Sequence, residues 1–273
     1  MIYIILPILN RKQLTLELLA SLSLQTYKDF DITIVDDGST DGSKEEIRVR
    51  YPDIQIIEGA GDWWWAESVN MGLRFVLPKA KEGDFVLIIN NDVEVKSNYL
   101  DEHIRTSTEN GRAVVGSLVK NFYDDRIHDA GILIDWSTYS FPNREYDPST
   151  KTKKVDALTT RGVLVPVEVF KKTGLFTSLL PHHAADMNFS LCAKRAGFPL
   201  IMSYEAVVYS KEKKGEKAWP FLTKYFSRRS SSNLGANMMF AMLNAPTLYL
   251  KIKSIMLIVW RFLRESSERV FPK

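Results

Sequence analysis

The sequence is poor in cysteine. Cys192 is the only cysteine among 273 residues, so no intrachain disulfide can form, and the chain suits a reducing compartment. The single cysteine and the four histidines show no spacing typical of a structural zinc site. Small folds held by disulfides or zinc are therefore excluded.

Long apolar leaders and glycine-rich phosphate loops are also missing. The apolar run at residues 2–6 is too short for a signal peptide and has no basic flank before it, so we expect the body to stay in the cytosol. No GxGxxG follows this first expected strand, and no GxxxxGK[ST] occurs anywhere. These absences argue against a dinucleotide dehydrogenase and a P-loop NTPase.

The charge is small overall but unevenly distributed. The net charge is +3, yet residues 211–273 hold 13 Lys/Arg and 4 Asp/Glu, a balance of +9 that leaves −6 for residues 1–210. An acidic body with a basic tail indicates that the two parts meet different partners. Nucleic acid is a poor candidate, because the body is acidic and contains no recognition module.

Strand-like and helix-like segments alternate in the first half of the chain. Strands are expected at 2–6, 32–35, 54–57 and 84–89, and helices at 11–24, 43–50 (with Ser43 and Glu46 as a capping box), 65–77 and from Ser97 onward. Such alternation predicts an α/β fold, with a mostly parallel sheet flanked by helices.

The pattern loosens after residue 110. Further strands are expected at 113–119 and 155–160, further helices at 167–173 and 184–196 (stopped by Gly197), and only apolar helices after 210. We therefore divide the chain into a domain at 1–210 and a helical tail at 211–273.

Polar side chains follow two of the expected strands directly. The buried run at residues 85–89 ends in Asn90-Asn91-Asp92, and the strand at 32–35 ends in VDDGSTDGS. Open α/β sheets bind ligands at the carboxyl ends of their strands, which favours a binding site at both places. A simple polar turn is the alternative, since Asn, Asp and Gly favour turns for backbone reasons.

Several segments together resemble a known family. They are PILNR at 7–11, VDDGSTDGS at 35–43, WWA at 64–66 with NMGL at 70–73, INNDVEV at 89–95, Arg161-Gly162, and the segment from 181 to 197. Their order and spacing are similar to those of family 2 glycosyltransferases of the GT-A fold (Rossmann-like), closest to rhamnosyl- and galactosyltransferase-like members. The resemblance covers about residues 1–210.

The resemblance implies a site for a nucleotide-sugar donor linked to UDP, dTDP or GDP. Asp36 matches the carboxylate that reads the nucleotide base, with Pro7 and Asn10 lining the same pocket. Further substrate contacts are predicted at Asp37, Trp65, Asn70, Asn91, Arg161 and His183. Trp65 belongs to a tryptophan triplet at 63–65, which either borders the cleft or packs in the core.

The resemblance also implies a divalent cofactor, Mn²⁺ or Mg²⁺. Asp92 matches the metal ligand of the DxD element and would hold an ion that bridges the donor diphosphate. The sequence departs from the pattern at Asn90, which replaces the first carboxylate, and at Ser210, where many relatives place a histidine. Asn90 as a turn cap is the alternative, with Asp92 and Glu94 left as the acidic groups.

Asp186 matches the general base of the family. It would remove the proton of an acceptor hydroxyl in an inverting transfer. Ala185 precedes it where many relatives have Glu. The alternative is that Asp186 only stabilises the N-terminus of a helix, where a carboxylate is favoured.

The segment at 247–264 predicts a basic amphipathic helix. Its apolar half carries Trp260 and Phe262, while Leu250, Leu257 and Ile258 interrupt the basic half, and basic residues at 211–217 and 228–229 add charge nearby. We expect it to bind an anionic membrane at the cytoplasmic face without spanning it. Packing on its own domain or forming a homodimer is the alternative.

The sequence thus predicts a metal-dependent inverting glycosyltransferase that builds surface polysaccharide on a glycan or lipid-linked acceptor. A nucleotide-sugar-binding protein with little turnover is the main alternative, favoured by Asn90, Ala185 and Ser210. A nucleotidyltransferase ranks third, because no basic phosphate-activating motif lies near the first strand.

Overall fold

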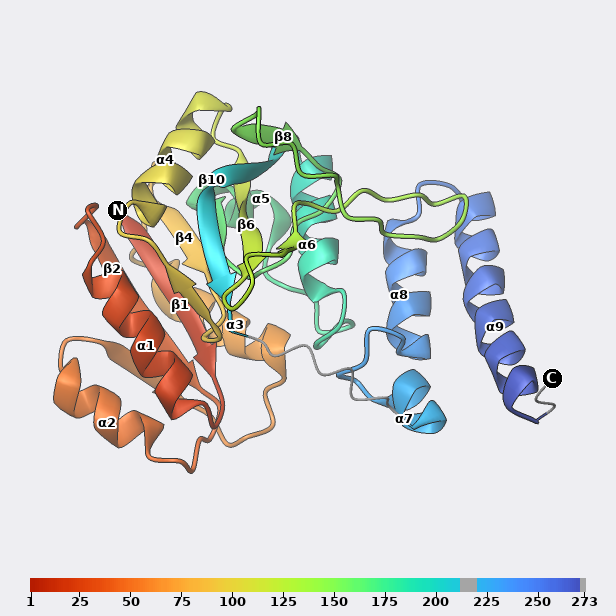
Figure 1. The fold of residues 1–273 in the computed structure, drawn as a ribbon, viewed down its shortest axis with the longest axis horizontal. Helices are drawn as coiled ribbons and strands as arrows, with labels where there is room; N and C mark the ends of the chain where they lie inside the picture. Colours follow the sequence, from red (N-terminus) through yellow and green to blue (C-terminus); the bar gives the residue numbers. More distant parts are fainter. Residues whose placement is uncertain (212–219, 271–273) are drawn as a thin grey trace.

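One sheet organises the fold (Figure 1), and the computed structural model describes residues 1–211 and 220–270. The strands follow the order β3-β2-β1-β4-β9-β6-β10-β5, with β7 beside β6 and β8 beside β10. Their bounds are β1 Ile2–Ile8, β2 Phe30–Asp36, β3 Gln55–Glu58, β4 Phe85–Ile88, β5 Val93–Val95, β6 Val114–Asn121, β7 Ile127–Asp129, β8 Thr152–Lys154, β9 Val163–Pro166 and β10 Leu200–Ser210.

Helices cover both faces of this sheet. They are α1 Lys12–Ser23, α2 Ser43–Arg50, α3 Trp65–Val76, α4 Tyr99–Glu109, α5 Val167–Thr173 and α6 Ala185–Arg195, followed by α7 Phe221–Phe226, α8 Leu234–Asn244 and α9 Leu248–Val270. Neighbouring residues of β1 point to opposite faces, so Ile4 packs in the core that includes α1 and Ile5 in the core that includes α3. Burial on both faces explains the continuous apolar runs of β1 and β4.

The predicted α/β class and the C-terminal helix are confirmed. The longest pairings, β1 with β2 and β6 with β10, are parallel, while β9 runs antiparallel between β4 and β6. The strand predicted at 155–160 is wrong, because this segment forms only an isolated bridge from Ala157 to Ile132. The short strands β5, β7, β8 and β9 and the long β10 were not anticipated.

The predicted capping box at Ser43 is also wrong. Gly42, with φ 77°, is the N-cap of α2, and Ser43 lies inside the helix. The Ser43 backbone N–H donates instead to Asp41 Oδ1 at 3.1 Å, so Asp41 caps the helix from outside. Gly197, with φ 92°, does follow the end of α6, as predicted.

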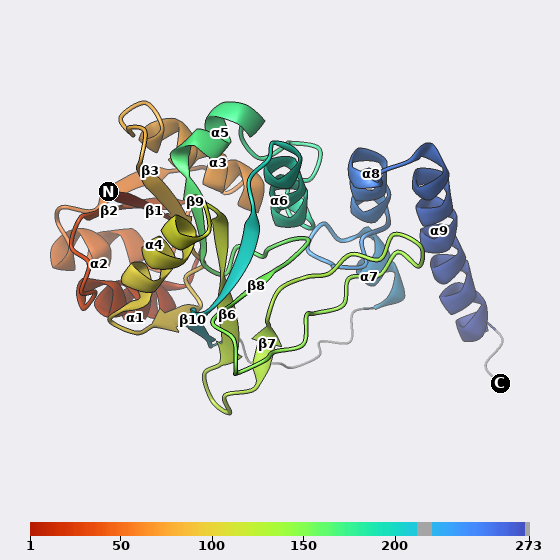
Figure 2. The same cartoon turned by 90° about the horizontal axis from the view of Figure 1, so that it is seen from above.

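The helices after residue 220 pack on the sheet domain through the long loop between β7 and β8 (Figures 1 and 2). Trp136 of this loop stacks on Phe240 of α8, with ring centroids 5.8 Å apart. Arg261 of α9 donates to the carbonyls of Thr138 and Tyr139 at 2.7 and 2.9 Å. Phe240 and Ile258 are buried in the same core as the sheet.

Candidate active site

The loops after β1 and β2 lie together at the carboxyl edge of the sheet. The two strands pair in parallel with Ile8 opposite Asp36, and Pro7 is one residue earlier on β1. Asn10 Oδ1 accepts the Thr40 N–H at 2.8 Å, and Asp36 Oδ1 accepts the Ser39 N–H at 2.8 Å. The residues predicted to read the nucleotide therefore share one hydrogen-bonded corner.

Asp37 holds the tryptophan loop in place. Its two carboxylate oxygens accept the backbone N–H groups of Gly61 and Trp63, each at 2.9 Å. Asp37 is buried, so its position favours holding the tryptophan loop over direct substrate contact. The Trp65 indole N–H donates to Asn90 Oδ1 at 3.3 Å, which joins this loop to the end of β4.

The Asn90-Asn91-Asp92 segment is tied to its surroundings by all three residues. The Asn91 amide donates to Thr15 Oγ1 at 3.0 Å, and Asp92 Oδ2 accepts from Arg11 Nη1 at 2.9 Å. Asp92 Oδ1 is buried and has no hydrogen-bond partner among the described residues. An unsatisfied buried carboxylate oxygen is costly, and it marks a place where a ligand can bind.

The residues around Asp92 fit a metal ion held chiefly by its substrate. In the described part of the chain, no three His, Cys, Asp or Glu side chains gather as a ready-made metal site. Glu94 is ion-paired with Lys211 at 2.7 Å. Ser210 is buried opposite Val93 of β5, so it lies near Asp92. Because Mg²⁺-type ions often take one or two carboxylates and complete their shell with phosphate and water, Asp92 alone suits such an ion.

The antiparallel pairing of β4 with β9 brings Arg161 to the same edge. Val163 lies opposite Ile88, so Arg161-Gly162 stands beside the end of β4. Gly162 has φ 99°, and a Cβ there would lie 2.1 Å from the Tyr99 hydroxyl, so only glycine fits. No pattern in the sequence indicates this pairing, and the strand was expected at 155–160 instead of at β9.

Asp186 lies in the first turn of α6, and Thr160, the residue before Arg161, donates a backbone hydrogen bond to it. Its Oδ1 also accepts the Met187 N–H at 2.8 Å. Burial raises the pKa of Asp186 to about 6, and the Asp129 charge adds to this, against those backbone hydrogen bonds. Burial therefore outweighs the stabilisation that a helix N-terminus gives a carboxylate.

Asp129 is a site residue that sequence reasoning missed. It is buried, and its oxygens accept the Gly131 N–H at 2.8 Å and the Thr159 hydroxyl at 2.7 Å. Thr159 and Thr160 thus anchor one acidic residue each. Asp129 lies at the end of a short strand without periodicity, so no pattern in the sequence could have singled it out. Arg11 belongs to the PILNR segment at 7–11, but its contact with Asp92 depends on the fold.

Two other predicted residues, Asn70 and Asn91, are buried, and a third, His183, is partly buried. His183 has its pKa lowered to about 4 by burial and by the neighbouring His182, so its ring is neutral at pH 7. Asn70 exchanges two hydrogen bonds with the Phe176 backbone, at 2.9 and 3.0 Å, and Asn91 donates to Thr15. These contacts favour a supporting role for Asn70 and Asn91. That they also contact the substrate stays a prediction.

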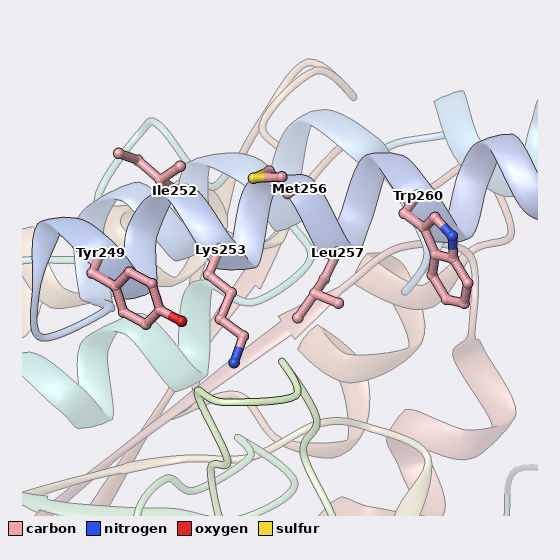
Figure 3. Close-up of a pocket in the computed structure, with 6 residues that line it drawn as sticks. All are labelled: Tyr249, Ile252, Lys253, Met256, Leu257 and Trp260. Atoms are coloured by element: carbon pink, nitrogen blue, oxygen red, sulfur yellow. The ribbon is translucent and has the colours of Figure 1, made fainter.

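A second distinctive surface lies on α9. Its inner side packs through Ser254, Ile258 and Arg261, whereas Tyr249, Ile252, Met256, Trp260 and Leu263 are between 52% and 69% exposed. A shallow groove of about 560 Å³ runs along this helix. Figure 3 shows the residues that line it, Tyr249, Ile252, Lys253, Met256, Leu257 and Trp260. We call the five exposed residues the α9 apolar strip.

Of the apolar residues that interrupted the predicted basic half, Ile258 is buried and Leu257 is partly buried against the core, whereas much of the predicted apolar half faces outward. Phe262 is the exception, because its ring packs on Phe221 and Tyr225 of α7. No helix of the described residues has the length and apolarity needed to cross a bilayer. Of the basic stretch at 211–217, only Lys211 lies within the described residues, and it is ion-paired with Glu17 and Glu94.

Comparison with known proteins gives one family. A family model described as "Glycosyl transferase family 2" matches residues 3–174. Curated relatives include the glycosyltransferase GlyG of Streptococcus pneumoniae, 26% identical over 45% of this chain, and the glycosyltransferase AglE of Haloferax volcanii, 21% identical over 75%. A third is an N-acetylglucosaminyl-diphospho-decaprenol L-rhamnosyltransferase of Mycobacterium tuberculosis, 26% identical over 38%. The chain spans 36% to 64% of the length of these relatives.

Solved structures share the fold at low identity. A structure of GalNAc-T7 with UDP, GalNAc and Mn²⁺ superposes with a TM-score of 0.67 and 13% identity, covering 94% of this chain and 54% of the other. A mannosyltransferase from Pyrobaculum calidifontis in complex with GDP-Man and Mn²⁺ superposes with a TM-score of 0.65 and 18% identity, covering 97% of this chain and 73% of the other. At these identities the likeness establishes the fold alone.

Proposed function

Because the chain belongs to glycosyl transferase family 2, we propose that it transfers a sugar from a nucleotide-sugar donor to a hydroxyl group of an acceptor, with inversion at the anomeric carbon. The acceptor oxygen forms a bond to that carbon while the bond to the diphosphate breaks. The hydroxyl proton passes to Asp186, and the nucleoside diphosphate leaves.

One observation carries this proposal: the partly buried carboxylate of Asp186 is held by the backbone N–H groups of Met187 and of Thr160, the residue before Arg161, and burial raises its pKa to about 6. A general base works best when its pKa lies near the operating pH, because it is then ionised yet still attracts a proton. The Asp129 carboxylate raises the proton affinity of Asp186 further, which suits a base.

The carboxyl ends of β1, β2 and β4 suit the donor. Asp36, Asn10 and Pro7 form the corner for the base and ribose, and Arg161 offers a planar cation for the diphosphate or the sugar. A divalent ion at Asp92 would offset the charge that develops on the leaving diphosphate. The neighbours solved with UDP or GDP-Man and Mn²⁺ support a donor and an ion of these classes.

The acceptor is proposed to be a glycan or lipid-linked precursor of a surface polysaccharide. The relative that acts on a decaprenol-linked sugar supports this, and with it a rhamnosyl- or galactosyltransferase-like subgroup. The α9 apolar strip supports it too, because cations border the strip. Lys253 Nζ lies 5.8 Å from the ring centroid of Tyr249, and Arg264 Cζ lies 5.2 Å from that of Trp260. Exposed aromatic residues with flanking cations suit an anionic membrane surface at the cytoplasmic face.

A donor-hydrolysis assay tests the reaction. Purified protein is incubated with UDP-, dTDP- and GDP-linked sugars and Mn²⁺ or Mg²⁺, and release of the nucleoside diphosphate is measured. Turnover of one donor class, lost in Asp186→Asn when acceptor is present, supports the proposal. Donor binding without turnover under every condition favours the alternative of a nucleotide-sugar-binding protein.

A further inference from the structure

Arg228, Trp64 and His182 form a row that ends at the loop before α6, the helix that carries the candidate base. The Arg228 guanidinium carbon lies 5.3 Å from the centroid of the Trp64 ring. The Trp64 ring in turn contacts the edge of His182, with centroids 6.0 Å apart and planes at 71°. The three residues come from the loops before α3 and α6 and from the segment between α7 and α8, so only the fold brings them together.

This row carries positive charge without a matching acid. Arg228 and Arg229 are both exposed, and neither forms an ion pair with any carboxylate in the ranges 1–211 and 220–270. Burial and the Arg229 charge lower the pKa of His182, so this ring is neutral at pH 7. His182 Nδ1 is buried and has no hydrogen-bond partner among the described residues. Two adjacent cations and an unused ring nitrogen therefore converge near Trp64.

We propose that Arg228, Arg229 and His182 bind a phosphate or diphosphate group of the acceptor, with Trp64 holding Arg228 in position. Guanidinium groups match phosphate oxygens in pairs of parallel hydrogen bonds, and stacking on an indole ring orients such a group in advance. His182 Nδ1, when it carries the ring proton, donates to a further phosphate oxygen.

The location favours the acceptor over the donor as the source of this phosphate. His182 lies in the loop that leads into α6, four residues before Asp186, so an anion bound here would lie on the segment that carries the candidate base. The donor diphosphate is assigned to Asp92 and Arg161 at the end of β4. Arg228 and Arg229 also lie in the short segment between α7 and α8, and α8 is followed by α9. A diphosphate that joins a membrane lipid to the acceptor sugar would lie between the α9 apolar strip and the base.

This inference rests on the proposed function, in which Asp186 is the base, but its test reads binding without turnover. The full-length protein is first saturated with whichever of UDP, dTDP and GDP stabilises it most. Inorganic pyrophosphate and farnesyl diphosphate are then titrated in by calorimetry at low salt. Both probes are expected to bind to the nucleotide-saturated protein, and the affinity should fall about 10-fold or more in Arg228→Gln/Arg229→Gln.

Two matched variants sharpen the test. Arg48→Gln/Arg50→Gln removes two exposed arginines of α2 and should leave probe binding unchanged. Arg228→Lys/Arg229→Lys keeps the charge but loses the planar fork, so it should bind with intermediate affinity. Lack of binding once the nucleotide is present would assign the phosphate to the donor site and overturn the inference. Equal binding by the wild type and Arg228→Gln/Arg229→Gln would overturn it as well. Neither of these two results would contradict the proposed transfer reaction, which the Asp186 variant tests separately.

Discussion

Arg11 Nη1 lies 2.9 Å from Asp92 Oδ2, so the carboxylate that matches the metal ligand of the family is already paired with a cation of its own chain. Arg11 is about half exposed, whereas Asp92 is mostly buried. The pair joins the loop after β1 to the loop after β4. A metal ion arriving with the donor would therefore meet one Asp92 oxygen paired with Arg11 and one that has no partner among the described residues.

Replacing Arg11 tests this competition. In Arg11→Gln, Asp92 loses its internal cation, and Mn²⁺ should bind the donor-free protein about 2- to 5-fold more tightly, the scale of an exposed ion pair. Asp92→Asn should weaken Mn²⁺ binding in the same titration, followed by the electron paramagnetic resonance of free Mn²⁺. An unchanged affinity in both variants would mean that Asp92 does not bind the ion.

Asp186→Asn should lower acceptor-dependent turnover by ~10²-fold or more, the contribution of a general base, while donor binding stays close to that of the wild type. The wild-type rate should rise with pH through about 6, since only the ionised carboxylate of Asp186 takes a proton. The measurement is a steady-state rate with acceptor at several pH values. Glu82→Gln, at an exposed turn, is the control. A variant with full rate would remove Asp186 from the mechanism.

The same substitution should stabilise the protein at neutral pH. Burial raises the folded-state pKa of Asp186 to about 6, above ~3.9 for an unfolded aspartate. The folded state therefore holds this proton more tightly, and stability falls as the pH rises from 4 through 6. Asparagine cannot ionise, so Asp186→Asn should unfold with ~1–3 kcal/mol more free energy at pH 8 and show no such gain at pH 4.

Urea unfolding at the two pH values measures this effect. Asp156→Asn is the matched control, because the pKa of Asp156 is shifted in the opposite direction from that of Asp186. The pKa of Asp156 is lowered because Lys194 and the Ile134 N–H donate to its carboxylate, which outweighs its burial. That variant should lose stability at pH 8. A stability gain of Asp186→Asn that persists at pH 4 would have a cause other than the ionised carboxylate.

The α9 apolar strip should bind anionic lipid. Full-length protein should sediment with liposomes that contain anionic lipid, and high salt should release part of it, because the cationic share of binding is screened and the apolar share is not. Trp260→Glu should release most of it. Val49→Glu changes an exposed apolar residue of α2, at the far end of the molecule from α9 in Figure 1, and should bind as the wild type does.

Deleting residues 241–273 should also abolish sedimentation, although this deletion removes Ile258 from the core. The point variants therefore carry the test. Equal release by Trp260→Glu and Val49→Glu would make the strip a contact between copies of the chain or with another protein.

The helices after residue 220 should unfold together with the sheet domain. Phe240 is fully buried and stacks on Trp136, so Phe240→Ala should cost ~3–5 kcal/mol of unfolding free energy. Calorimetry should show one transition, shifted to lower temperature in the variant. The opposite result would be two unfolding transitions, with only the one of smaller enthalpy shifted in temperature by Phe240→Ala. It would support the predicted boundary at residue 210 as a division between independent folding units.

The sequence alone determined the first four strands and their helices. Apolar runs such as residues 85–89 can be buried only inside a covered sheet, and the Asn, Asp and Gly after them must lie at its edge. Local patterns of this kind also located the helix that carries Asp186 and the amphipathic helix at the end of the chain. These features depend on residues that are neighbours in the sequence, which is why a pattern can show them.

Tertiary structure decided what depends on distant residues. The antiparallel insertion of β9 beside β4 places Arg161 and Thr160 at the site, and no periodicity records which strand lies beside which. The proton affinity of Asp186 depends on burial and on Asp129, which lies 57 positions away in the sequence. The outward side of α9 was likewise settled by the contacts of its other side, where Ile258 is buried in the same core as Phe240 and Arg261 donates to the carbonyls of Thr138 and Tyr139. Burial and charge depend on distances through space, and those exist only once the chain has folded.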